Sequence, residues 1–187
     1  GFKRSDLGEN WAATEGQSDY FAAHRCVPKL WRADLATNAS FRHKVDKIAR
    51  DACNENWKTR QQRDLCYRIA MVGKSDAAMI ADATGRGPTS KFENESVKIT
   101  QDAYGGHPSP RRRLDPQFAA ALCKVKFDDD IPRIIKGHSN RSVEAEKHSE
   151  QYTCHASKGK AIGSRPERWF KPRLTFKPLN INNWSIY

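Results

Sequence analysis

The chain has 187 residues, and its 33 Lys and Arg against 22 Asp and Glu give a formal net charge of +11. This length suits one domain, alone or with a tail, and is too short for two full cores. No apolar run approaches the ~18 residues of a membrane-spanning helix, and no apolar segment follows the first residues as in a signal peptide, so neither is predicted.

The apolar residues predict a small core that depends on aromatic rings. Leu, Ile, Val and Phe together number 32 of 187, a low fraction for a globular chain. Five Trp, five Tyr and eight Phe offset this shortage, because each buried ring removes roughly 150–250 Å² from water. We therefore expect aromatic anchors and long irregular stretches.

The clearest predicted element is a helix over 40–54. Phe41, Val45, Ile48 and Ala52 recur at the spacing of one helical face, with Cys53 beside them. Charged residues occupy the other face.

Three shorter helices are predicted from capping residues that precede them. Ser75 caps the first, which Gly85 ends, and Ser142 caps the third. Asp115 caps the second, with Pro116 at its first position. The predicted helices cover 76–84, 116–124 and 143–150.

Short runs with a β-branched or aromatic bias predict four strands. The order mixes helices and strands irregularly, which favours an α+β fold over a doubly wound parallel sheet. We predict a compact α+β domain over 1–155 with a Gly- and Pro-rich loop or linker at 85–116, followed by an extended arm over 156–187. The predicted strands cover 66–72, 96–100, 131–136 and 152–155.

The predicted arm is basic, aromatic and punctuated by proline. It holds seven of the Lys and Arg but only one acid, and prolines at 166, 172 and 178 keep it extended. Bases track phosphates and rings stack on nucleobases, so the pattern suits single-stranded nucleic acid. The same rings could instead strap the arm over the protein's own core. The predicted nucleic-acid-binding residues are Lys158, Lys160, Arg165, Arg168, Trp169, Phe170, Lys171, Arg173, Phe176 and Lys177, together with Arg111, Arg112 and Arg113.

A histidine cluster at 138–155 offers a different chemistry. Ribonuclease activity without a metal needs two proton-transfer groups and a cation on the phosphate. His138, His148 and Glu144 have the right types for proton transfer, and Arg141 supplies the cation. The spacing of His and Cys here matches no common zinc finger, so no metal site and no cofactor are predicted. Dinucleotide-binding, Walker and calcium-loop motifs do not occur.

Cysteines and glycosylation sequons favour an oxidising compartment. Five scattered cysteines predict two disulfides and one odd thiol, with a connectivity that spacing does not fix. Four Asn-x-Ser/Thr sequons, at Asn38, Asn94, Asn140 and Asn183, add to this prediction. We expect a protein of the secretory lumen or the cell exterior; the alternative is an intracellular chain inside a large complex.

These observations predict a polyanion-binding protein whose expected partner is RNA or another nucleic acid. The enzymatic alternative is a secreted ribonuclease-like toxin or effector that uses the histidine cluster. The third alternative is a basic structural or linker subunit whose arm enters a larger protein or ribonucleoprotein assembly.

Overall fold

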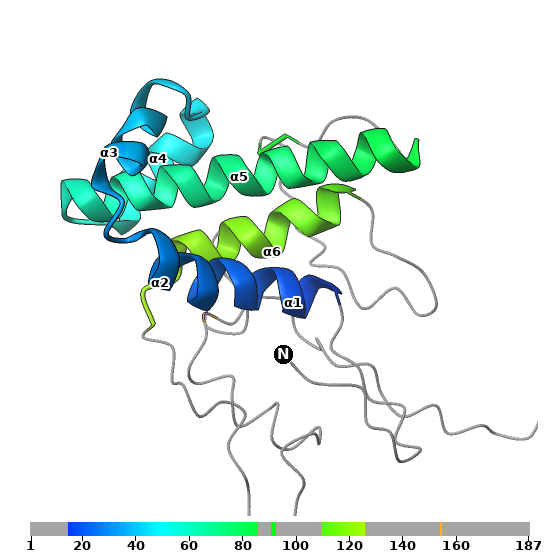
Figure 1. Cartoon of the computed structure of the whole chain (residues 1–187), viewed down its shortest axis with the longest axis horizontal. Helices are drawn as coiled ribbons and strands as arrows, with labels where there is room; N and C mark the ends of the chain where they lie inside the picture. The colour runs from blue at the N-terminus through cyan, green and yellow to red at the C-terminus, as the bar shows by residue number, and fades with distance from the viewer. Residues whose placement is uncertain (1–14, 86–90, 93–109, 126–153, 155–187) are drawn as a thin grey trace, which may run out of the picture.

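The computed structural model describes residues 15–85, 91, 92, 110–125 and 154, and every regular element among them is a helix (Figure 1). The α+β class predicted from the sequence is therefore wrong for these residues, which contain no strand. The elements are α1 (Glu15–Phe21), the π-helix η1 (Ala22–Cys26), α2 (Val27–Trp31), α3 (Leu35–Ser40), the 3₁₀-helix η2 (Phe41–His43), α4 (Lys47–Asn56), α5 (Arg60–Thr84) and α6 (Pro110–Leu122).

The helices pack in layers around α6 (Figure 1). One side of α6 packs on α5, and the other packs on α1 and η1. The shorter α3, η2 and α4 gather on the N-terminal half of α5. This end of the molecule therefore brings together four elements that are close in sequence.

The longest helix, α5, replaces both a predicted strand and a predicted helix. It begins at a capping box, in which Thr59 Oγ1 accepts from the backbone N–H of Gln62 and the Gln62 side chain accepts from the backbone N–H of Thr59. It ends at Gly85, which adopts the left-handed conformation with φ 61°. The predicted end at Gly85 is confirmed, but the strand at 66–72 is wrong and Ser75 lies inside the helix, where its hydroxyl donates to the Met71 carbonyl.

The predicted helix over 40–54 is divided into η2 and α4. Asp46 is extended, with ψ 147°, and it starts α4 as an N-cap residue. Arg50 donates to the carbonyls of Val45 and Arg42, which satisfies backbone groups at the break. The predicted apolar stripe still faces the core, because Val45 and Cys53 are buried.

Helix α6 begins six residues before the predicted start. Pro110 is its first residue, a position that tolerates proline because no N–H is needed there. Asp115 is therefore no N-cap, and Pro116 lies inside the helix, buried, where it leaves the carbonyl of residue 112 without its usual N–H donor. The last part of the predicted 85–116 linker is helical, while the division into domains stays a prediction.

Helices α5 and α6 pack closely at Gly73. A Cβ at this position would lie 2.9 Å from Gln117 Oε1 and 3.1 Å from Gln117 Cβ. The Gln117 amide spans the contact and donates to Asp76 Oδ2 at 2.8 Å. The surrounding core is rich in alanine and aromatic rings, and Tyr20 and Leu114 are its largest fully buried side chains.

Two disulfides join the helices to one another and to residue 154. Cys53–Cys66 links α4 to α5, and Cys123–Cys154 links the end of α6 to a residue 31 positions later. Cys26 is free and exposed. The predicted two disulfides with one odd thiol are therefore confirmed.

His24 in η1 is buried beside Tyr20 and reaches the segment after α6. Its Nε2 lies 2.9 Å from the Val125 carbonyl oxygen, so the neutral ring donates to that oxygen. Burial lowers the pKa of His24 from 6.5 to about 4, because desolvation disfavours the imidazolium more than the Val125 hydrogen bond favours it.

Candidate anion-binding site

Four arginines converge on one hollow at the N-terminal end of α5. Arg42 comes from η2, Arg50 from α4, and Arg60 and Arg63 from the first turn of α5. The hollow has a volume of about 490 Å³ and is completed by Asp64 and Tyr67. We call these six residues the arginine pocket.

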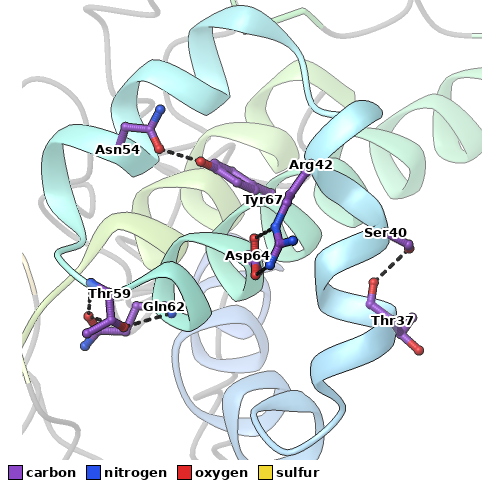
Figure 2. Close-up of polar contacts among 8 residues, drawn as sticks. All are labelled: Thr37, Ser40, Arg42, Asn54, Thr59, Gln62, Asp64 and Tyr67. Carbon is purple, nitrogen blue, oxygen red and sulfur yellow. Dashed lines mark hydrogen bonds and ion pairs between the residues drawn. The ribbon is translucent and has the colours of Figure 1, made fainter.

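An ion pair between Arg42 and Asp64 fixes one wall of the arginine pocket (Figure 2). Arg42 Nε donates to Asp64 Oδ1 at 2.6 Å, and Nη2 donates to Oδ2. The Asp64 side chain is only 5% exposed, whereas that of Arg42 is 30% exposed. The hydrogen bonds that Arg42 donates to Asp64 raise the pKa of the guanidinium, and the two-point contact holds it in one orientation.

Tyr67 lines the arginine pocket and ties α5 to α4. Its ring is buried, and its hydroxyl donates to Asn54 Oδ1 (Figure 2). The Cys53–Cys66 disulfide joins the same two helices one residue away on each side. The geometry of the pocket therefore depends on the α4–α5 junction.

Three guanidinium charges in the pocket have no described carboxylate partner, those of Arg50, Arg60 and Arg63, and only Arg50 is held by backbone carbonyls. Among the residues that the structure describes, Asp64 is the one carboxylate in its lining, and Arg42 engages both of its oxygens. No ion pair joins Arg60 or Arg63 to a described carboxylate. A guanidinium presents a planar fork of donors that matches phosphate and carboxylate oxygens, so the pocket is suited to an anion.

A second polar network lies beside the pocket and is structural. Arg68 Nη1 donates to Asp34 Oδ2 and to Asn38 Oδ1, each at 2.9 Å, and its guanidinium lies 4.0 Å from the centre of the Trp31 ring. A hydrogen bond from Thr37, followed by that from Arg68, lowers the pKa of Asp34. The network fixes α3 on α5.

Asn38 belongs to a sequon, but its folded environment leaves no room for a glycan. The residue is 1% exposed, and its Nδ2, the atom that would carry the sugar, donates to the Trp31 carbonyl at 2.8 Å. We expect native protein from a glycosylating host to lack a glycan at Asn38. Peptide mapping by mass spectrometry checks this, and high occupancy in the folded, monodisperse fraction would contradict it.

Most residues of the predicted sites lie outside the described part of the chain. This applies to His138, Arg141, Glu144 and His148, and to the whole arm from Lys158 to Lys177, so their roles stay predictions.

The Arg111–Arg113 cluster lies in α6. Arg113 donates through Nε and Nη2 to the two carboxylate oxygens of Asp19, at 2.9 and 2.7 Å. This pair ties α6 to α1 and gives Arg113 a structural role. Its predicted contact with nucleic acid stays untested.

The arginine pocket was missed in the sequence analysis. Arg60, Arg63, Asp64 and Tyr67 follow the spacing of one helical face, and this was the available local signal. Arg42 and Arg50 join them only through the packing of η2 and α4 on α5.

The described residues thus form a small disulfide-bonded helical protein with a basic pocket. No helix among them has the length and apolar character that crossing a membrane requires. Within the same residues, no three His, Cys, Asp or Glu side chains gather as metal ligands would. No protein-family model, no curated protein and no solved structure matches the chain.

Proposed function

We propose that this protein binds a polyanion, nucleic acid in particular, and that the arginine pocket holds one of its phosphates. The observation that carries the proposal is the lining of the pocket, with four guanidinium groups and one compensated carboxylate. The net charge of +11 supports it, because a strong positive field attracts polyanions and speeds their association.

The parts of the pocket have different tasks under this proposal. Arg42 is held by Asp64, so it meets an incoming phosphate without further ordering. Arg60 is exposed and Arg63 is partly exposed, so both can reach an anion from solution. The predicted arm over 156–187 would add contacts along the same polyanion.

The two disulfides are typical of a protein that folds in an oxidising compartment. We infer that the protein acts in the secretory lumen or outside the cell. In such a compartment both disulfides stay closed, so the protein that binds the polyanion is covalently cross-linked.

Replacing Arg60 and Arg63 together with alanine is expected to weaken binding to single-stranded RNA. Each lost charge-assisted contact costs about tenfold in affinity at low salt. The slope of log affinity against log salt should flatten by about 1.4, since each phosphate contact on a single strand contributes about 0.7. Fluorescence anisotropy over a salt series measures both quantities.

A double substitution of Arg32 and Lys124 is the matched control. Both side chains are exposed and lie outside the arginine pocket. Replacing them removes two positive charges, the same number as replacing Arg60 and Arg63. Equal losses in the two double variants would show a diffuse charge effect and no site. Wild-type protein without salt-dependent RNA binding would end the proposal.

A further inference from the structure

A second, smaller hollow adjoins the arginine pocket. Its volume is about 230 Å³, and Arg42, Arg60 and Asp64 line both spaces. The residues that belong to it alone are Leu35, Asn38 and Gln61. The two hollows therefore share a charged wall and differ on their outer sides.

The outer side of the smaller hollow carries no charge of its own. Leu35 at the start of α3 is 48% exposed, so part of its apolar side chain faces this hollow and solvent. Asn38 is already engaged, since it donates to Trp31 and accepts from Arg68. Gln61 is exposed at the second position of α5, and no hydrogen bond joins its side-chain amide to a described residue.

This combination of groups matches a nucleobase better than a second phosphate. An exposed leucine offers an apolar surface to the face of a flat ring, and a free amide can both donate to and accept from a base edge. A volume of 230 Å³ falls below the ~300–1,000 Å³ of pockets that enclose a whole ligand, so the space suits one part of a larger molecule.

We propose that the two hollows together bind one nucleotide step of a single-stranded nucleic acid. The phosphate lies in the arginine pocket, and the adjoining base lies on Leu35 with its edge against Gln61. Arg42 and Arg60 stand between the two subsites, where the sugar and its flanking phosphate oxygens would pass. Because Asp64 holds Arg42, this dividing wall keeps its shape before the ligand arrives.

The inference rests on the proposed function, because the base subsite has a purpose only if phosphate enters the neighbouring pocket. It adds the claim that the ligand carries a nucleobase beside its phosphate. Polyanions without bases, such as inorganic polyphosphate or a sulfated polysaccharide, would use the arginine pocket and leave the smaller hollow unoccupied.

The test compares the full chain with a variant that combines Leu35→Ser and Gln61→Ala. The ligands are a short single-stranded oligoribonucleotide and inorganic polyphosphate. We expect RNA affinity to fall about tenfold, through loss of apolar contact and a base-edge hydrogen bond. Affinity for polyphosphate and the salt slope for RNA should not change, since no phosphate contact is removed.

Leu30→Ser is the control, because Leu30 is 73% exposed and lines neither hollow. All these side chains are exposed enough for the fold to tolerate the changes, and equal thermal midpoints establish this. An unchanged RNA affinity in the combined variant overturns the base subsite, as does an equal loss of polyphosphate affinity. If the Arg60 and Arg63 variant also binds RNA like wild type, the proposed function fails separately.

Discussion

Replacing both Cys53 and Cys66 with alanine is expected to lower the free energy of unfolding by about 3 kcal/mol. The disulfide closes a loop between residues 13 positions apart, and a cross-link of this span restricts the unfolded chain by about that amount. Both cysteines are buried between α4 and α5, so contact with solvent does not offset the loss of the bond. Chemical denaturation of wild type and double variant under non-reducing conditions measures the difference.

Cys26→Ala is the control for this change, because Cys26 is exposed and forms no disulfide. It should leave stability within about 0.5 kcal/mol of wild type. The Cys53 and Cys66 variant should also bind RNA less well, since the arginine pocket spans the α4–α5 junction. A double variant as stable as wild type would contradict a stabilising role for the bond.

Lowering the pH from 7 to 4 is expected to destabilise the fold through His24. Above pH 6.5 the His24 imidazole is neutral in both the folded and the unfolded chain. Between about pH 6.5 and 4 it is protonated in the unfolded chain but stays neutral in the folded chain. The free energy of unfolding therefore falls by about 1.4 kcal/mol per pH unit in this window, and by about 3 kcal/mol in full. Denaturant midpoints measured at intervals of half a pH unit follow the loss.

His24→Gln isolates this contribution from the carboxylates that titrate in the same range. A glutamine amide can still donate to the Val125 carbonyl but does not titrate, so the variant should lose less stability between pH 6.5 and 4. His43→Gln, at an exposed position in η2, should follow wild type. A His24→Gln profile that runs parallel to wild type would refute the assignment.

The sequence predicted helix positions better than fold class. The end of α5 at Gly85 and the apolar stripe from Phe41 to Cys53 were predicted, because glycine termination and helical periodicity are local properties. The strand at 66–72 failed, since a short apolar run reads equally as a buried strand or as part of a buried helix. The deciding pattern was longer: the buried residues Cys66, Ala70, Gly73, Ala77 and Ala81 continue at helical spacing beyond the run.

The start of α6 shows how a correct rule can be applied to the wrong residue. Proline favours the first position of a helix, and from the sequence alone either Pro110 or Pro116 could occupy that position. The packing of Leu114 and Phe118 into the core decides between them, because it requires helix on both sides of Pro116. Such tertiary contacts are not visible in the local sequence.

For the candidate site, the sequence predicted the kind of ligand but not the residues that form the pocket. The excess of positive charge indicated an anionic partner, but the residues chosen for contact were the arm and the Arg111–Arg113 cluster. The arginine pocket gathers side chains that span residues 42–67, and their meeting depends on how η2 and α4 fold back onto α5. Arg113 is the opposite case. It was predicted to contact nucleic acid, and its ion pair with Asp19 gives it a role in packing α6 on α1.

The Cys123–Cys154 bond also determines what proteolysis can release from this molecule. A single backbone cut between these two cysteines leaves both fragments in one covalent unit. Residues 156–187, with their seven bases and one acid, therefore stay tethered to the helices after such a cut. They separate only where the surroundings are reducing enough to open the disulfide, so a nicked chain would keep its basic terminus outside cells and lose it on entering a cytosol.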